Sequence, residues 1–370
     1  MSRAPDDDRF MRLALQEAHK GLGQTHPNPA VGAVIVKSGR VIASGYHARA
    51  GTAHAEANAL MLAGKRAKGA TIYSTLEPCD HFGRTPPCTQ GILEAGITRV
   101  VYGSSDPNPL VDGKGLKRMR RAGLKVEGGV LAAECDALNE PFFKVMRTGL
   151  PFVTVKSAMT LDGKIATASG ESKWITGEKA RAEGMRLRAG ADAILVGVNT
   201  VLADDPGLTV RQGPGSKVQG PRLRRIVLDS RARMPLKSNV VSDEFAALTT
   251  IVVGRSVPAK RVAALARTVS VVRAPLRGGR IDLRWLLKKL GRENVTSLLV
   301  EGGGEVNASF LLGGLAHRVV FFYAPKILGG RDSHKAVAGE GARSLGDVLS
   351  LSEVEWRRVG DDLMMTARVK

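Results

Sequence analysis

The sequence predicts two consecutive α/β domains, and three observations lead to that fold class. The chain has 370 residues, which is long for one domain and fits two of ordinary size. Short apolar runs typical of strands alternate with helix-forming segments along almost the whole chain. A change of domain is expected near residues 147–151, because residues that break regular structure bracket it: Pro141, Gly149 and Pro151. We therefore expect one domain at 1–148 and a second at 149–370.

The first domain is expected to start with a helix that Asp6 to Asp8 cap and that ends near Gly21. Two runs at 31–36 and 41–44 flank a Lys-Ser-Gly-Arg turn and predict a β-hairpin. The alternation that follows predicts a largely parallel sheet between helices. The expected helices lie at 54–63, 89–95, 115–122 and 131–138, and the expected strands at 70–75, 99–103 and 124–127.

The second domain repeats the alternation and is expected to be α/β as well. Residues 356–369 hold a Gly-Asp-Asp turn between two extended runs, which predicts a closing hairpin, and residues 212–220 are expected to form a mobile polar loop. The expected strands lie at 152–157, 193–197, 225–228, 250–253, 269–272, 297–300 and 319–323, and the helices at 178–188, 260–266 and 283–290.

The charge and the composition of the chain limit the classes of partner that it is expected to bind. The 55 Lys and Arg against 35 Asp and Glu give a formal net charge of +20, which suggests nucleic acid as one partner. However, no sustained basic run is interleaved with aromatics, and 4% aromatic residues leave few platforms for stacked bases. We therefore expect a basic surface that attracts small phosphorylated ligands, and no nucleic-acid partner.

The expected location is the cytoplasm. Three cysteines cannot form a disulfide framework, and two of them belong to the motif described next. The amino-terminal residues lack the basic and apolar regions of a secretory signal. No run approaches the roughly 20 apolar residues that a membrane span requires, so no membrane partner is expected.

The most informative stretch runs from His54 to Cys88. It contains His54-Ala55-Glu56, then Pro78-Cys79, then Cys88. One imidazole and two thiolates are three ligands of a zinc site whose fourth position stays open for water, and a glutamate that is not a ligand can carry the proton. Zinc deaminases use this arrangement, although their usual P-C-x-x-C spacing is shorter than the nine positions here. The alternatives are a structural zinc, for which His81 is the obvious fourth ligand, and core residues that bind no metal together.

The residues also carry a family resemblance. The segments His26 to Gly32, His54 to Glu56 and Glu77 to Cys88, with its long cysteine spacing, resemble the bifunctional riboflavin-biosynthesis deaminase/reductase family, RibD. The resemblance implies a cytidine-deaminase-like three-layer α/β/α domain that holds zinc through His54, Cys79 and Cys88, with Glu56 as the proton shuttle. It also implies a homo-oligomer and deamination of 2,5-diamino-6-ribosylamino-4(3H)-pyrimidinone 5′-phosphate. Weaker candidates for substrate contact are Asn28, His47 and His81, each of which can instead be a local loop residue.

In the second domain a strand runs into Glu301-Gly302-Gly303-Gly304 and then a helix. Such a turn brings bare backbone N–H groups toward an anion, although a simple tight turn is the alternative. This segment, Leu161-Asp162-Gly163, residues 168–172 and residues 200–206 resemble the RibD reductase domain, whose fold is like dihydrofolate reductase. The resemblance implies that NADPH reduces the ribosyl group of the deaminated intermediate.

By motif position the resemblance assigns two sets of residues in the second domain. The cofactor set is Ala158, Trp174, Thr200, Asp204, Gly303, Gly304, Glu305, Val306, Asn307, Ala308 and Ser309. The substrate set is Ser172, Arg188, Leu208, Arg211 and Glu301. Arginines suit a phosphate because their donors form a planar fork, although a surface ion pair is the alternative for either one. Lys156 is a weaker candidate for polarising the substrate, and a snorkelling surface lysine is its alternative.

Two other functions stay open on the sequence alone. One is a nucleoside or tRNA deaminase with an accessory domain, which would not oxidise NADPH. The other is a zinc-stabilised binding module with an inactive reductase domain, which would release no ammonia. An assay that follows both ammonia and NADPH separates the three hypotheses.

Overall fold

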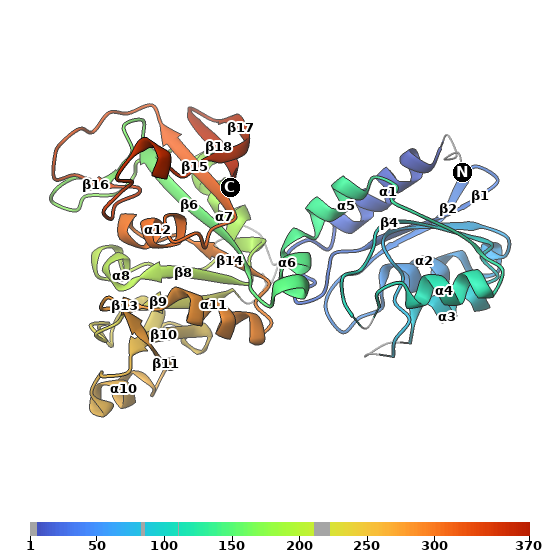
Figure 1. Cartoon of the computed structure of the whole chain (residues 1–370), viewed down its shortest axis with the longest axis horizontal. Helices are drawn as coiled ribbons and strands as arrows, with labels where there is room; N and C mark the ends of the chain where they lie inside the picture. The colour runs from blue at the N-terminus through green and yellow to red at the C-terminus, as the bar shows by residue number, and fades with distance from the viewer. Residues whose placement is uncertain (1–5, 83–85, 110, 211–222) are drawn as a thin grey trace. The chain divides into compact units, whose positions relative to one another are not determined.

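The computed structural model describes residues 6–82, 86–109, 111–210 and 223–370. The chain divides into two compact units, Met1–Gly149 and Leu150–Lys370, each with its own sheet and core (Figure 1). The loop expected at 212–220 and the candidate Arg211 lie outside the described residues. No helix in the described part of the chain is long and apolar enough to cross a membrane.

The first unit is built on a five-stranded sheet with the order β2-β1-β3-β4-β5. β1 is antiparallel to both β2 and β3, as the expected hairpin requires, whereas β3, β4 and β5 are parallel. The carboxyl ends of these parallel strands therefore meet at one edge of the sheet. The strands are β1 (Gly32–Lys37), β2 (Arg40–Tyr46), β3 (Thr71–Leu76), β4 (Arg99–Ser104) and β5 (Lys125–Gly128).

Helices cover both faces of this sheet. Neighbouring residues of β1 point to opposite faces, so Val34 packs with Phe10 and Met11 while Ile35 packs with Ala59 and other apolar residues. One face carries α1 (Asp7–His19) and α5 (Ala132–Leu138), and the other carries α2 (Ala55–Ala63), η1 (Gly64–Ala67), α3 (Cys88–Glu94) and α4 (Lys114–Arg121). The three-layer α/β/α prediction is confirmed.

One helix of the first unit was not expected. α6 (Glu140–Thr148) follows α5 directly, and its buried Phe142 and Phe143 join the core on the α2 side of the sheet. We expected Pro141 to break regular structure, but it lies in the first turn of α6, where the missing N–H has no helical partner to lose. The helix ends at Gly149, whose φ of 68° suits glycine.

The second unit contains a nine-stranded sheet with the order β11-β10-β9-β8-β14-β6-β15-β18-β17. The strands from β11 to β15 are parallel, and β18 and β17 add the expected antiparallel hairpin at one edge. The strands are β6 (Phe152–Thr160), β8 (Ala193–Gly197), β9 (Arg224–Leu228), β10 (Thr249–Gly254), β11 (Ser270–Ala274), β14 (Ser297–Val300), β15 (Arg318–Ala324), β17 (Leu351–Val359) and β18 (Asp362–Val369). Two small ribbons pair β12 (Leu276–Arg277) with β13 (Arg280–Ile281), and β7 (Lys164–Ala166) with β16 (His334–Lys335).

The central strands of this sheet are buried on both faces, which explains their continuous apolar runs. Leu195 packs on the side of α11 and α12, whereas Ile194 and Val196 pack on the side of α8, α9 and α10. The prediction of a second α/β domain is confirmed. The helical segments are α7 (Glu178–Ala189), α8 (Val198–Asp204), α9 (Asn239–Ser242), η2 (Ala246–Leu248), α10 (Ala259–Leu265), α11 (Leu283–Arg292), α12 (Gly304–Leu311) and η3 (Leu345–Asp347).

Candidate functional sites in the two domains

Short local elements position the metal motif of the first unit. His54 is the residue before α2, Cys79 follows the end of β3, and Cys88 is the first residue of α3. α2 lies directly against β2 because Gly45 has no side chain: a Cβ there would be 2.6 Å from the carbonyl oxygen of Ala55. The sheet edge and the starts of two helices therefore bring the three residues together.

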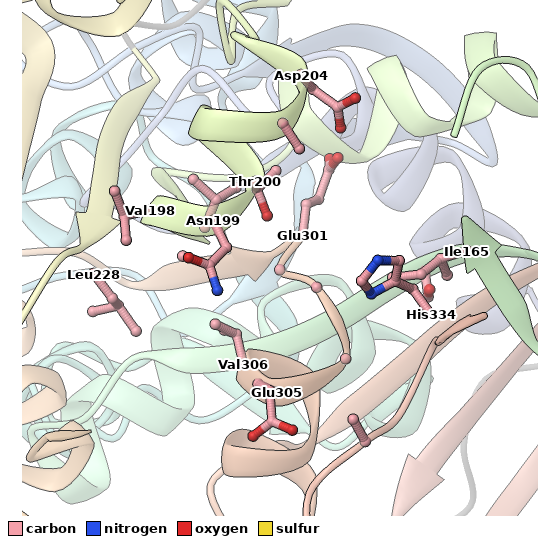
Figure 2. A pocket seen from close by; sticks show the side chains of 18 of the residues that line it. Ile165, Val198, Asn199, Thr200, Asp204, Leu228, Glu301, Glu305, Val306 and His334 are labelled. Carbon is pink, nitrogen blue, oxygen red and sulfur yellow. The ribbon is translucent and has the colours of Figure 1, made fainter. Parts of the chain in front are cut away.

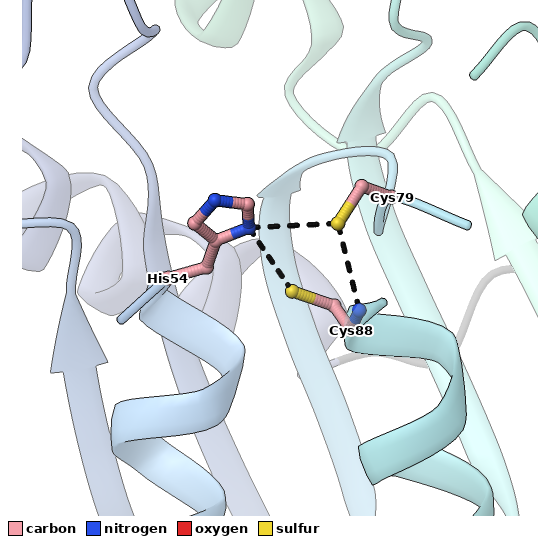
Figure 3. A group of neighbouring side chains, drawn as sticks. All are labelled: His54, Cys79 and Cys88. Carbon is pink, nitrogen blue, oxygen red and sulfur yellow. Dashed lines mark hydrogen bonds between the residues drawn. The ribbon is translucent and has the colours of Figure 1, made fainter. Parts of the chain in front are cut away.

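The three side chains converge on one point (Figure 3). Their ligand atoms all lie within 4.8 Å of one another. His54 Nδ1 is 3.5 Å from Cys79 Sγ and 3.3 Å from Cys88 Sγ. A tetrahedral zinc with ordinary Zn–N and Zn–S bonds separates such atoms by about 3.6 Å. The donor set and its spacing therefore fit zinc.

The surroundings of Cys79 favour the ionised form of its sulfur, the thiolate. It accepts a hydrogen bond from the backbone N–H of Cys88 at 3.5 Å, shown in Figure 3. Hydrogen bonds from the Cys88 thiol and from His54 lower the pKa of Cys79 to about 4, although burial acts in the opposite direction. A thiolate is the form that binds a metal.

Glu56 lies one helical position beyond the start of α2 and is 3% exposed. Its Oε1 accepts a hydrogen bond from the hydroxyl of Ser74 at 3.2 Å, and its Oε2 lies 3.5 Å from Cys88 Sγ. Burial raises the pKa of this carboxyl group, and the nearby charge of Cys79 adds to that rise. Glu56 is therefore a carboxyl group that can accept and return a proton beside the metal ligands.

A cavity of about 340 Å³ opens onto His54, Glu56 and Cys79. The weaker candidates Asn28, His47 and His81 all line it, so the structure brings them to the same site. Asn28 Nδ2 lies 3.2 Å from His47 Nε2, and His47 Nδ1 lies 3.1 Å from the carbonyl oxygen of Ala53. The imidazole of His47 is thus fixed at both nitrogens.

Sequence reasoning missed the loop that forms the other wall of this cavity. Glu77, Asp106 and Asn108 line it. Glu77 holds the loop by accepting hydrogen bonds from the N–H groups of Gly113 at 2.8 Å and Asp106 at 3.4 Å. Burial raises the pKa of Asp106 to about 6. A signal was present, because Asp-Pro-Asn-Pro follows β4, whose carboxyl end lies beside that of β3.

The second unit has a larger cavity, of about 840 Å³, at the carboxyl edge of its parallel strands (Figure 2). Gly302, Gly303 and Gly304 form part of its wall at the start of α12. A Cβ on Gly302 would be 2.5 Å from Val306, and one on Gly304 would be 2.3 Å from the carbonyl oxygen of Lys335. A Cβ on Gly303 would meet only open space. The loop therefore needs glycine and leaves bare backbone facing the cavity, as the pyrophosphate of a dinucleotide requires.

Three charged side chains form the polar centre of this cavity. Arg188 donates two hydrogen bonds of 2.9 Å to the two carboxylate oxygens of Glu301, and Lys156 Nζ lies 3.6 Å from Glu301. Burial would raise the pKa of Glu301, but the charges of Lys156 and Arg188 lower it to about 2. The Glu301 side chain is only 10% exposed and remains an anion. Lys156 is therefore paired inside the site and is not a surface lysine.

Most residues that the resemblance assigned to the reductase line this one cavity. They are Ala158, Thr200, Asp204, Gly303, Gly304, Glu305, Val306 and Ser309 of the cofactor set, and Ser172, Arg188, Leu208 and Glu301 of the substrate set.

Three described members of the cofactor set lie elsewhere. Trp174 is 62% exposed, with the guanidinium of Arg181 over its ring. Asn307 is fully buried, and its side-chain amide donates a hydrogen bond to the carbonyl oxygen of Ala336 at 2.9 Å. Ala308, the next residue of α12, is 4% exposed. Asn307 and Ala308 therefore fix α12 instead of facing the cavity.

Several cavity residues were not found from the sequence. Asn199, Ser230, Arg233, Arg280 and Lys335 line its wall. They come from segments spread over more than 100 residues of the sequence, so no local motif links them. The only sequence signal is their position, because Asn199 and Ser230 closely follow the ends of the adjacent parallel strands β8 and β9.

Known proteins match both units. Residues 151–365 match the family model of the RibD C-terminal domain, and residues 4–104 match that of the cytidine and deoxycytidylate deaminase zinc-binding region. The riboflavin biosynthesis protein RibD of Actinobacillus pleuropneumoniae is 45% identical over 96% of this chain and 93% of its own. That of Aquifex aeolicus is 45% identical over 97% of both chains. The chain belongs to the RibD family.

Solved RibD structures agree with this assignment. Acinetobacter baumannii RibD has a TM-score of 0.89 and 35% identity over 99% of both chains. A diaminohydroxyphosphoribosylaminopyrimidine deaminase/5-amino-6-(5-phosphoribosylamino)uracil reductase from Thermotoga maritima has a TM-score of 0.84 and 36% identity, covering 98% of this chain and 99% of its own. The two-domain fold expected from the sequence, including the RibD reductase fold of the second domain, is thereby confirmed.

The family assignment gives the function. The chain is a bifunctional riboflavin-biosynthesis enzyme with a zinc-binding deaminase domain and a reductase domain of the NADPH-dependent RibD type. Its substrate class is a small phosphorylated pyrimidine. The two alternatives left open by the sequence, a nucleoside or tRNA deaminase and an inactive binding module, do not account for matches that span both domains.

Proposed function

We propose that the first domain hydrolyses the 2-amino group from 2,5-diamino-6-ribosylamino-4(3H)-pyrimidinone 5′-phosphate. The second domain then reduces the ribosyl group of that product to give 5-amino-6-ribitylamino-uracil 5′-phosphate. The observation that carries the proposal is the convergence of His54, Cys79 and Cys88 beside the buried Glu56, at the wall of a cavity large enough for a pyrimidine.

In the deaminase site we assign His54, Cys79 and Cys88 as the zinc ligands. Zinc in such a site supplies Lewis acidity, which lowers the pKa of a water molecule at the open fourth position. Glu56 would accept a proton from the attacking water and return it to the departing amino group, a role that suits a buried carboxyl with a raised pKa. Ser74 fixes the carboxylate, while Asn28 and His47 are placed to contact the pyrimidine.

In the reductase site we assign Ser172, Arg188, Leu208 and Glu301 to the substrate, with Arg211 in the same role by motif position. NADPH bound in this cavity would supply a hydride for C1′ of the ribosyl group in its open imine form. The Lys156 ammonium polarises the C1′–N bond and donates a proton to the nitrogen. Glu301 accepts two hydrogen bonds from Arg188 and lies 3.6 Å from Lys156, so it orients both side chains. The glycine loop and the other cofactor residues that line the cavity hold NADPH.

We also propose that the enzyme is a cytoplasmic homo-oligomer that does not use nucleic acid. Its three cysteines are free, which suits a reducing compartment where a dithiolate metal site persists. β17 is a largely exposed edge strand, and Trp356 on it is 58% exposed, so this edge is a surface that a second copy can cover.

The direct test is incubation of the protein with the diaminopyrimidinone phosphate, with and without NADPH, followed by mass analysis. Without NADPH we expect ammonia and the deaminated ribosylamino product. With NADPH we expect the ribitylamino product and stoichiometric loss of NADPH absorbance. Cytidine, guanine and tRNA serve as comparison substrates. Ammonia release from one of these instead of the phosphorylated pyrimidine would overturn the proposal.

A further inference from the structure

A short segment at the end of α8, residues 204–209, forms part of the wall of the reductase cavity. Its residues alternate, and every second one lines the cavity, namely Asp204, Pro206 and Leu208. The residues between them do not line it. Asp204, at the start of the segment, is visible in Figure 2. The 204–209 segment therefore has one face toward the cavity and a rear face toward the rest of the domain.

Two residues of the 204–209 segment have a left-handed backbone. The φ of Asp205 is 39° and that of Leu208 is 50°. Aspartate tolerates this region, but a leucine there is strained because its Cβ lies close to its own carbonyl oxygen. A strained residue keeps its conformation only where its surroundings hold it, and such residues gather at functional sites. The contacts of the 204–209 segment therefore decide where Leu208 lies.

Two side chains hold the rear face of the 204–209 segment. Arg225, on β9, donates a hydrogen bond to the carbonyl oxygen of Gly207 at 2.9 Å. Asn239, the first residue of α9, donates from its side-chain amide to the carbonyl oxygen of Asp205 at 2.7 Å. Its backbone N–H donates to the carboxylate of Asp205 at 2.9 Å. Neither Arg225 nor Asn239 lines the cavity, so both act on its wall from behind.

The guanidinium of Arg225 is itself fixed on its other side. Its side chain is 1% exposed, and the carboxylate of Asp243 accepts two hydrogen bonds from it, at 2.6 and 2.7 Å. It also donates to the carbonyl oxygen of Val240 at 3.3 Å. A buried ion pair returns little more free energy than the desolvation of its charges costs, so stability alone does not account for this arginine. What Arg225 adds is geometry, because its rigid fork fixes the Gly207 carbonyl relative to α9.

The 204–209 segment also reaches the polar centre of the cavity. Arg188 donates to the carbonyl oxygen of Thr209 at 3.0 Å. Arg188 and Leu208 belong to the substrate set, so this inference rests on the proposed binding of the deaminated intermediate against them. Glu301 holds Arg188 independently of the segment, through two hydrogen bonds of 2.9 Å. Loss of the contacts on the rear face should therefore displace Leu208 and leave the charged centre in place.

We propose that Arg225 and Asn239 are positioning residues of the reductase, which place Leu208 against the deaminated intermediate by holding the rear face of the 204–209 segment. They act on substrate binding, because the wall that they hold lies apart from the group assigned to donate the proton, Lys156 on β6. Their loss should therefore raise the KM of the intermediate and leave kcat nearly unchanged.

The test is steady-state reduction of the deaminated intermediate by the full-length enzyme, with KM and kcat determined separately. Arg225→Lys keeps a positive charge beside Asp243 but replaces the rigid fork with a single flexible ammonium. We expect the KM of the intermediate to rise by about tenfold and kcat to change by less than about twofold. The KM of NADPH and the rate of deamination should keep their parental values.

Asn239→Ala tests the same role from a second segment. Asn239 is exposed, so its loss should not unfold the domain. The variant removes the side-chain hydrogen bond to Asp205 and keeps the one from the backbone, so the KM of the intermediate should rise less, by about threefold. Thermal melting of each variant checks the fold, and Asn239→Ala carries the test if Arg225→Lys does not fold.

Each variant has a matched control. Arg224 precedes Arg225 on β9 and is paired with Glu293 at 2.6 Å, but it points to the opposite face of the sheet, so Arg224→Lys makes the same change away from the segment. Ser242, exposed on α9, donates only to backbone carbonyl groups near its own helix, which gives Ser242→Ala as the control for Asn239→Ala. Both controls should keep the parental KM.

The outcomes separate this inference from the function beneath it. A folded variant whose KM for the intermediate is unchanged removes its residue from the positioning role, even where its melting temperature falls. Equal rises in the KM of NADPH and of the intermediate also overturn the inference, because the contacts would then support the whole cavity. Failure of the parent to reduce the intermediate overturns the proposed function itself, and the inference with it.

Discussion

Each domain has a buried glutamate at the centre of its site, Glu56 in the first and Glu301 in the second, and the surroundings shift their two pKa values in opposite directions. Burial raises the pKa of Glu56, and the charge of Cys79 reinforces the rise. Glu301 also experiences burial, but Lys156 and Arg188 lower its pKa to about 2. A carboxyl group with a raised pKa exchanges protons, whereas one held this low is a permanent anion. The same residue type is therefore a proton carrier in one site and a fixed counter-charge in the other.

The two sites also differ in how the chain builds them. The deaminase ligands and Glu56 come from one stretch of 35 residues between His54 and Cys88. The reductase cavity takes its wall from segments between Lys156 and Ala338. A compact site depends on a few short contacts, so one substitution should abolish its chemistry. A distributed site shares its contacts among many residues, so single substitutions should weaken it by degrees.

The largest expected effect is loss of the metal. Cys88→Ser replaces a thiolate ligand with a poor one, so zinc content should fall from about one per chain to near zero and deamination should be lost. Reduction of the deaminated intermediate should persist. Metal analysis and separate assays of the two steps measure this, and Cys135→Ala, at a buried cysteine outside the cluster, is the control. Full deamination by chelated, zinc-free protein would contradict the metal assignment.

Glu56→Gln should retain zinc but slow deamination by about 10²- to 10⁴-fold, the usual worth of a positioned acid–base group. The amide keeps the shape of the side chain and cannot carry the proton. The exposed Glu94, which accepts a hydrogen bond from Gln90 on α3, gives the matched control Glu94→Gln. Ammonia release at the parental rate by Glu56→Gln would remove Glu56 from the mechanism.

Glu301→Gln should act in the second domain only. It leaves Arg188 and Lys156 without their shared anion, so we expect reduction to fall by about tenfold or more and stability to fall by about 3 kcal/mol. Denaturant unfolding and a steady-state NADPH assay measure the two effects. Glu293→Gln, which removes an exposed partner of Arg224 and Lys289, should change stability by less than about 1 kcal/mol.

The pH dependence of this stability difference has a defined sign. The pKa of Glu301 lies at about 2 in the folded protein, below its ordinary value of 4.5. Its contribution is therefore complete above pH 4.5 and is lost as the pH falls toward 2, by about 3 kcal/mol in total. The gap in unfolding free energy between the parent and Glu301→Gln should be constant from pH 6 to 8 and should shrink at pH 3. A gap that widens in acid would show that Glu301 is not held as an anion.

The contrast between the sites also explains what could be read from the sequence. The sequence predicts a metal site at His54, Cys79 and Cys88, which the structure brings together, because metal ligands must be specific residue types at short spacing, each next to a recognisable helix or strand. The alternation of elements predicted both α/β folds for a similar reason, since burial on both faces of a parallel sheet leaves continuous apolar runs.

The site residues that could not be predicted from the sequence are those that only tertiary contacts bring together. Arg233 and Arg280 come together with Asn199 only because β9 and β8 are neighbours and β13 lies near them, which no local pattern states. Asp106 reaches the deaminase cavity because Glu77 holds its loop through the N–H groups of Asp106 and Gly113. Conversely, Asn307 fits the cofactor motif in sequence, but its side chain turns inward to Ala336.

The smallest expected effect tests how far the compact site tolerates loss of a supporting contact. Ser74→Ala removes the hydroxyl that donates to Glu56 Oε1 at 3.2 Å, without touching a metal ligand. One hydrogen bond to a carboxylate is worth about 1.5 kcal/mol, so kcat for deamination should fall by roughly tenfold while zinc content and KM stay unchanged. Ser44→Ala, whose hydroxyl donates to Glu17 away from the cavity, is the matched control. A fall in zinc content, or an equal fall in Ser44→Ala, would mean that Ser74 supports the fold and does not position Glu56.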